Sequence, residues 1–288
     1  MGRRATVILV GVLAVVVLIG MAGLVWWFTR DEAPPVVDLA STVAQVDSSN
    51  PTTDDSEKPG ATSSTTENPA TSTAETTTSS VADTSRTDTE VSSADPSTEL
   101  ANALDGMWMV RVTEGAVDLR EQPAVSFAGY RVDEVLAGGI GRNTAVGRTA
   151  DVAGSIEISG GNLAAATVVV TMATLRTDDS HRDSHARGVL DPDEFPHAIF
   201  TLVEPLDLPA GMADGEAFSG SAQGALTIRG VTRSATFDLQ AQVVGGTIVA
   251  VGSSEVVFSD YGVDTPTSIS VISVEDHGVM EFQLIFTR

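Results

Sequence analysis

Three of the four histidines of the chain lie in one short stretch, HRDSHARGVLDPDEFPHAIF, at residues 181–200. His181 and His185 are four residues apart, so on a helix both would lie on one face, with Asp183 between them in the sequence. Imidazole and carboxylate groups are ligands that zinc accepts, and histidines at this spacing occur in helical zinc sites. A catalytic metal site is therefore the first interpretation to test.

The rest of the sequence argues against a metal. A catalytic zinc site needs three protein ligands and further groups that orient them, and His277 is too distant in sequence to be assigned to the pair. The nearby acidic cluster of Asp191, Asp193 and Glu194 lacks the spaced oxygen ligands and the glycine of a calcium loop, so a solvated surface is the better interpretation. We predict no metal, no cofactor and no enzymatic activity.

The N-terminus contains a long apolar run. Residues 5–28 are uncharged and, as a helix, long enough to cross a hydrocarbon core of about 30 Å. Arg3 and Arg4 precede the run and an Asp-Glu pair follows it, which places the N-terminus in the cytoplasm and the rest of the chain outside. A cleaved signal peptide is the alternative, but the run is longer than usual and a Trp-Trp-Phe sequence replaces the cleavage site. Residues 1–30 are thus predicted to be a transmembrane signal anchor in the cell membrane.

Composition changes after the anchor. Residues 31–100 are rich in Ser, Thr, Ala, Pro and acidic residues, with almost no large apolar side chains. Such a segment buries too little surface to offset its chain entropy, so we predict a disordered acidic linker. Because the chain has no cysteine, the exported domain that follows is expected to be stable without disulfides.

The charge balance excludes one class of partner. The formal net charge is −23, and residues 101–288 alone contain 25 acidic and 11 basic residues. Nucleic-acid binding requires clustered Lys and Arg, so nucleic acid is not an expected partner.

Residues 101–288 have the alternating pattern of a β protein. β-branched and aromatic residues recur at a period of two, and turn-rich segments separate the runs. Several strands at short intervals favour an antiparallel barrel or sandwich. The clearest runs are residues 166–175, 197–206, 224–231, 235–244, 254–263 and 279–286.

The alternation also indicates which residues point inward. In residues 279–286 it separates Phe282 and Leu284 from Glu281 and Gln283, so one face is predicted to be buried and the other wet. If the inward residues fill the interior, which is the commoner case, the domain is a structural barrel; if the barrel is wide, they line a cavity for one apolar ligand. The candidate lining residues, chosen by alternation alone, are Val168, Val170, Met172, Phe200, Leu226, Ile228, Phe237, Leu239, Phe282, Leu284 and Phe286.

A longer pattern surrounds the opening stretch and extends over most of residues 107–288. Its members are Arg182, Asp183 and His185; Phe195 and Pro196; Phe200; Gly224, Leu226, Thr227, Gly230, Val231 and Thr232; and Ser259, Tyr261 and Gly262. This order resembles the YceI-like family of bacterial polyisoprenoid-binding domains, which have a lipocalin-like β-barrel. The chain departs from the family pattern at Ala186, where the family usually has Leu, and in a longer first hairpin.

The resemblance implies that Arg182, Asp183, His185, Phe195 and Pro196 are a family signature at a short helix and the barrel mouth. They would then form no catalytic centre.

Local chemistry suggests roles for the residues around this helix. Thr177 or Asp178 is expected to cap it, and Asp183 to bridge a neighbouring arginine or a turn amide. Pro196 is expected to end the helix and release the next strand at His197.

The sequence and the resemblance together imply a function. The expectation is an exported domain, tethered to the membrane through residues 5–28, that holds an isoprenoid or another long apolar chain inside the barrel. Carriage, sequestration and sensing of such an amphiphilic lipid all fit. The alternative is a filled barrel that acts as a surface protein-interaction module.

Overall fold

The computed structural model describes residues 33–49, 103–121, 123–136, 141–265 and 271–288. Two α-helices, α2 (Leu39–Ser49) and α4 (Ser180–Leu190), occur in these ranges. Short 3-10 helices are η1 (Leu119–Glu121), η3 (Met172–Thr174), η4 (Ala210–Asp214) and η5 (Phe258–Tyr261). The strands are β1 (Gly106–Val110), β2 (Phe127–Leu136), β3 (Gly141–Thr149), β4 (Val152–Ser159), β5 (Asn162–Thr171), β6 (His197–Leu202), β7 (Leu206–Asp207), β8 (Phe218–Ile228), β9 (Val231–Val244), β10 (Thr247–Val257) and β11 (Val271–Thr287).

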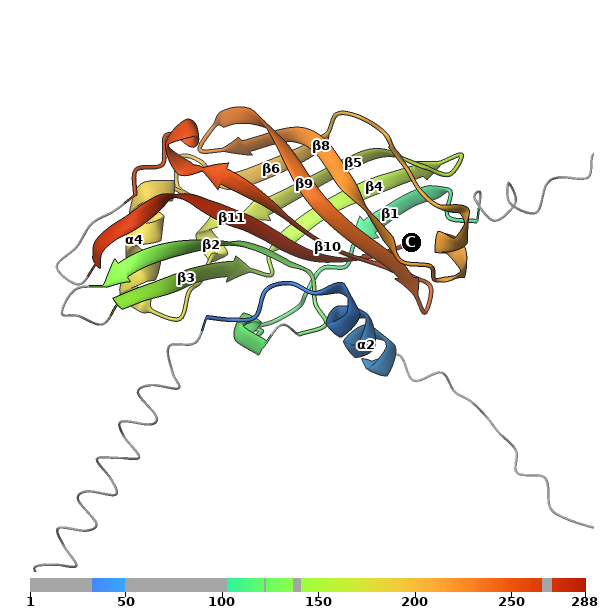
Figure 1. The fold of residues 1–288 in the computed structure, drawn as a ribbon, viewed down its shortest axis with the longest axis horizontal. Helices are drawn as coiled ribbons and strands as arrows, with labels where there is room; N and C mark the ends of the chain where they lie inside the picture. Colours follow the sequence, from blue (N-terminus) through green and yellow to red (C-terminus); the bar gives the residue numbers. More distant parts are fainter. Residues whose placement is uncertain (1–32, 50–102, 122, 137–140, 266–270) are drawn as a thin grey trace, which may run out of the picture.

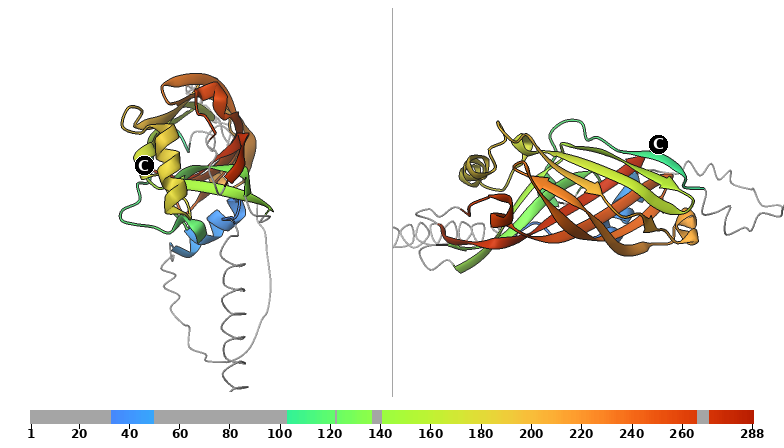
Figure 2. Two further views of the ribbon diagram at one scale, coloured as in Figure 1. Left: turned by 90° about the vertical axis from the view of Figure 1, so that its left-hand side faces the viewer. Right: turned by 90° about the horizontal axis from the view of Figure 1, so that it is seen from above.

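These strands form one antiparallel sheet that closes on itself. The order is β1-β4-β5-β6-β8-β9-β10-β11, and β11 pairs again with β1. Seen from one end, the strands surround a common interior, and α4 lies across that end (Figure 1; Figure 2, left). The expected all-β antiparallel barrel with a short helix is confirmed.

On one of its edges, the long strand β11 pairs with two different strands, one toward each of its ends. Its last residues pair with β1 through Val110 and Phe286, whereas the part up to Gln283 pairs with β2. The β2–β3 hairpin therefore completes the wall at the α4 end, where Arg148 forms an isolated bridge with Arg176. Next to β11, the barrel wall is thus formed by β1 at one end and by the β2–β3 hairpin at the other.

Turn chemistry explains where some strands end. The β9–β10 hairpin has a two-residue turn in which Gly245 and Gly246 have φ angles of 55° and 78°, a combination that glycine adopts readily. The predicted run 254–263 is a strand only to Val257, after which η5 follows and ends at Gly262 with φ 66°. The turn-rich segment before residue 224 was not predicted to be a strand, yet β8 begins there.

The outer face of β10 and β11 is covered by the chain that precedes the barrel. Helix α2 lies against this face and also contacts β9 (Figure 1). Leu39 and Val46 of α2 pack on Val249, Val251 and Ile285, and all five side chains are buried. The prediction of a disordered linker over residues 31–100 is therefore wrong for residues 33–49. The free energy gained by burying these outward-facing apolar residues offsets the conformational entropy that is lost when the segment becomes ordered.

Polar groups beneath this cover are also satisfied. The predicted wet positions Glu281 and Gln283 are fully buried, which corrects the expectation of a solvated outer face. Gln283 Oε1 accepts a hydrogen bond from Thr42 Oγ1 at 2.7 Å, and its Nε2 donates to the carbonyl oxygens of Pro123 and Val125 at 2.8 and 2.9 Å. Burial of this amide is tolerated because its oxygen and its nitrogen each have a hydrogen-bond partner.

Replacing Val46 by Asp is expected to release α2 from the barrel. The variant loses the burial of one valine side chain and would bury an unpaired carboxylate, so we expect the free energy of unfolding to fall by about 1.5–3 kcal/mol. Faster hydrogen exchange over residues 39–49 in the folded protein would report the release. Ala44→Asp, on the exposed side of α2, is the control. Equal exchange in both variants would contradict the docked helix.

The predicted membrane anchor, residues 1–30, lies outside the described residues, as do residues 50–100 of the predicted linker. Among the helices that are described, none has the length and apolar character to cross a bilayer.

Candidate binding cavity

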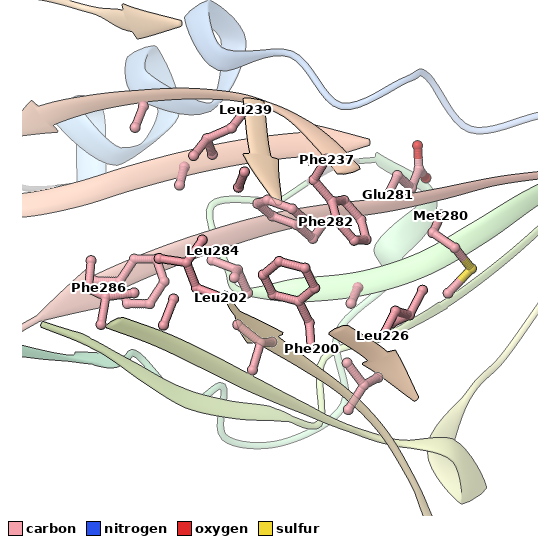
Figure 3. Close-up of a pocket in the computed structure, with 18 of the residues that line it drawn as sticks. Phe200, Leu202, Leu226, Phe237, Leu239, Met280, Glu281, Phe282, Leu284 and Phe286 are labelled. Atoms are coloured by element: carbon pink, nitrogen blue, oxygen red, sulfur yellow. The ribbon is translucent and has the colours of Figure 1, made fainter. Parts of the chain in front are cut away.

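The barrel encloses an apolar cavity. Its volume is about 150 Å³, and its walls come from strands on every side of the barrel and from η4. Native interiors contain few voids larger than a water molecule, so a space of this size is more than a packing defect. Figure 3 shows Phe200, Leu226, Phe237 and Leu284 among the side chains around it. The interior is therefore not the filled core that strand alternation makes the commoner case.

Ten of the eleven predicted lining residues line this cavity. The exception is Ile228, which we had expected to face the cavity. It is the last residue of β8, and it is buried at the α4 end in a cluster with Met172, Tyr261 and Val263. Here η3 and η5 reach over the barrel end, so Ile228 packs against them. Ligand contact by the other ten residues stays a prediction.

Several lining residues are not among those predicted from the sequence. Alanines such as Ala222 and Ala250 leave the space open. Because alanine occurs on both faces of a strand, the alternation of apolar and polar residues does not show that these two point inward. Ile156 and Ile158 of β4 alternate clearly and were available as a signal. Met212 lies in η4, inside a segment that its glycines made turn-like, and carried no periodic signal.

Three phenylalanines pack together in the middle of the cavity wall. The ring centroids of Phe200 and Phe237 are 5.1 Å apart at an interplanar angle of 77°, and those of Phe237 and Phe282 are 5.6 Å apart at 50°. These edge-to-face and tilted arrangements are the favourable ones for aromatic pairs. A Cβ at Gly224 would lie 2.3 Å from the Phe200 ring, so glycine is required at this signature position for the ring to lie flat on β8.

Helix α4 is fixed by short-range polar contacts. Asp179 is its N-cap and accepts hydrogen bonds from the backbone N–H groups of His181 and Arg182, so the predicted caps Thr177 and Asp178 are wrong by one or two residues. The Asp183 carboxylate accepts from the backbone N and the Oγ1 of Thr177 at 2.7 and 2.9 Å. This is the turn-amide alternative for Asp183, and it closes the loop between η3 and α4.

Arg182 joins α4 to the barrel wall. Its Nη2 lies 2.7 Å from Glu134 Oε1 on β2, and its Nη1 contacts Asp178. Asn143 Nδ2 donates to the same Glu134 oxygen at 2.9 Å. Burial alone would lower the pKa of Arg182, but the two carboxylates outweigh it and hold the pKa above its usual value. The signature arginine thus has a structural ion-pair partner on each side.

The two histidines of α4 are exposed, and the helix ends before the signature proline. The side chains of His181 and His185 are exposed, and no group of three potential metal ligands occurs within the described ranges. The helix ends before Asp191, which has φ 47° and donates to the Arg187 carbonyl, so Pro196 does not end it. Strand β6 does begin at His197, as predicted.

Phe195, also a signature residue, is partly buried, and the guanidinium of Arg229 lies 5.6 Å from its ring centroid.

Comparison with known proteins identifies the domain. A family model described as the YceI-like domain matches residues 120–286. A solved polyisoprenoid binding domain from Saccharophagus degradans is 16% identical, covers 56% of this chain and 93% of its own, and has a TM-score of 0.43. BcnA of Burkholderia cenocepacia is 21% identical, covers 54% and 95%, and has a TM-score of 0.40. A Campylobacter jejuni YceI protein is 18% identical, covers 48% and 82%, and has a TM-score of 0.40. The comparison with curated proteins finds no significant match.

Proposed function

The chain belongs to the YceI-like domain family, and from this premise we propose that its barrel binds an isoprenoid or another long apolar chain in its interior. The cavity is the observation that carries the proposal. Its lining is almost entirely apolar, and it lies inside a closed barrel where a hydrocarbon chain is removed from water. Each Å² of apolar ligand surface buried there contributes about 25 cal/mol, from which the cost of ordering the chain is subtracted.

A long ligand requires the lining to adjust. The cavity volume of about 150 Å³ is comparable to that of apolar cavities that hold a single benzene ring. A chain of several isoprene units therefore needs Phe200, Phe237 and Phe282 to rotate away from the barrel axis. In this proposal the three rings occupy part of the ligand path while the barrel is empty and turn aside when the ligand enters.

The second part of the proposal concerns location. The uncharged run at residues 5–28 and the arginines before it support a membrane anchor with the barrel on the outer side. A barrel held near a bilayer would take up or release an amphiphile without exposing its tail to water. Carriage, sequestration and sensing each fit this arrangement.

A charge placed inside the barrel tests the proposal. Leu239 faces the cavity, and the next residue on β9, Gln240, is exposed on the outer side. We expect Leu239→Arg to abolish lipid retention, because the guanidinium would occupy the path of the chain without a partner. Gln240→Arg should leave retention unchanged. Native mass spectrometry of the full-length chain released from micelles, followed by lipid extraction, measures retention.

A second variant covers the case in which Leu239→Arg does not fold. Leu239→Trp is uncharged and reduces the free volume, so it should shorten or exclude the bound chain. Wild-type protein that remains lipid-free after incubation with polyprenyl lipids would contradict the proposed function.

A further inference from the structure

The two ends of the cavity are closed in different ways. At the α4 end, the lining residue Met172 belongs to a buried cluster with Ile228, Tyr261 and Val263, and these last three do not line the cavity. Apolar side chains from the last turn of α4 pack on the same cluster. A layer of apolar side chains therefore lies between this end of the cavity and the solvent.

Hydrogen bonds also tie the cover of the α4 end to the barrel wall. The backbone of Arg176, between η3 and α4, exchanges two hydrogen bonds of 2.9 Å with the backbone of Arg148 on β3. The Asp276 carboxylate on β11 accepts from the backbone N and the Oγ of Ser259 in η5, at 3.0 and 2.6 Å. The ion pair between α4 and β2 adds a further contact. Opening this end would break all of these contacts and expose the apolar layer.

The opposite end of the barrel is covered by η4, which lies in the connection between β6 and β8 (Figure 1; Figure 2, right). The segment is attached to the wall on either side of η4. Leu208 N donates to the Gly161 carbonyl at 2.9 Å, and Gln242 Nε2 donates to the Gly215 carbonyl at 2.8 Å. Within the described chain, residues 209–214 make hydrogen bonds only inside residues 209–216. Between its two attachments, η4 is thus held over the cavity by side-chain packing.

Met212 provides the main part of this packing. It is the one buried residue of η4, at 2% exposure, and it lines the cavity. Methionine is unbranched and flexible, so its side chain can leave an apolar site and return without strain. Gly215 follows η4 with φ 90°, a conformation that glycine adopts readily and that permits a change of chain direction. An outward movement of η4 would expose one large side chain and break no hydrogen bond to a strand.

We propose that η4 is the movable cover of the cavity entrance, that Met212 is the side chain that closes it, and that the α4 end is the blind end of the cavity. This inference rests on the proposed function and adds the direction in which the ligand is held. The apolar tail enters first and ends beside Met172, whereas the polar end stays under η4. The reverse direction would bury a polar group among the apolar residues of the blind end.

A photoreactive ligand tests the direction. The probe is a polyprenol with a diazirine next to its hydroxyl group. The full-length wild-type chain in micelles is loaded with this probe, irradiated and digested, and mass spectrometry identifies the labelled residues. We expect the label in residues 206–218. Label in residues 172–190 or 258–263, or equal labelling at the two ends, would overturn the assignment.

Exchange rates test the role of Met212. We expect Met212→Ala to accelerate both the uptake and the release of a polyprenol about 3- to 10-fold, because the side chain that closes the entrance is missing. Timed native mass spectrometry during transfer between the full-length chain and phosphatidylcholine vesicles measures both rates. Asp214→Ala, at an exposed position of η4, is the control and should leave both rates unchanged.

Met172→Ala distinguishes the two ends. Met172 also lies in a 3-10 helix and lines the cavity, so its truncation removes contacts with the tail and should raise the release rate alone. An uptake rate that rises as much in Met172→Ala as in Met212→Ala, or that rises in neither, would overturn the assignment of the entrance. A wild-type chain that takes up no polyprenol would instead contradict the proposed function itself.

Discussion

Glu281→Ala is expected to lower the free energy of unfolding by about 3–5 kcal/mol, because it leaves the buried guanidinium of Arg148 and the largely buried one of Arg131 without a counter-charge. The Glu281 carboxylate lies 2.8 Å from Arg131 Nε and 2.6 Å from Arg148 Nη2, and the residue is 1% exposed. Burial lowers the pKa of Arg148, and Glu281 opposes this effect. Urea denaturation of the wild-type and variant chains measures the difference.

A second glutamate on the same strand provides the control. Glu275 lies 3.7 Å from Arg142, and its side chain is 32% exposed. Because solvent screens this pair, Glu275→Ala should cost less than about 1 kcal/mol. Similar losses in the two variants would mean that the cluster around Glu281 has no special role in stability.

Phe237→Ala is expected to have a comparable effect in the ligand-free barrel but a smaller one in the loaded barrel. Phe237 is 6% exposed and packs between Phe200 and Phe282, so its removal should cost about 3–5 kcal/mol in the empty protein. A bound prenyl chain would occupy the vacated volume, and binding to the folded state alone adds stability. The loss should therefore shrink when the ligand is present.

Urea titrations with and without a polyprenol measure both parts of this prediction. Thr236→Ala, on the exposed outer side of β9, should change stability by less than about 0.5 kcal/mol in either condition. A loss in Phe237→Ala that is the same with and without ligand would place the bound chain elsewhere.

The inner face of the barrel was largely predictable from sequence. On β11, Phe282, Leu284 and Phe286 alternate with polar residues, and all three line the cavity. Strand period is a strong signal because a slip of one residue would invert both faces. Ile228 was misplaced because alternation gives a direction along a strand and carries no information on what closes its end.

The outer face was not predictable in the same way. Glu281 and Gln283 look like solvent positions, and only a segment distant in sequence, which includes Thr42, reveals that they are covered. A signal did exist, since Val249 and Val251 are apolar on the side opposite to the lining residues. The ion pair between Glu134 and Arg182 was not predictable for a different reason: the two residues belong to separate parts of the chain, and only the barrel brings them together.

The docking of α2 joins two parts of the chain that are far apart in sequence. Leu39 and Val46 pack on the outer face of the barrel, although the first strand of the barrel begins only at Gly106. The entropic cost of bringing two such segments together rises only with the logarithm of their separation, so the contact is affordable despite that distance. The described chain therefore meets the barrel first at the outer face of β10 and β11, before any of its strands has formed the wall.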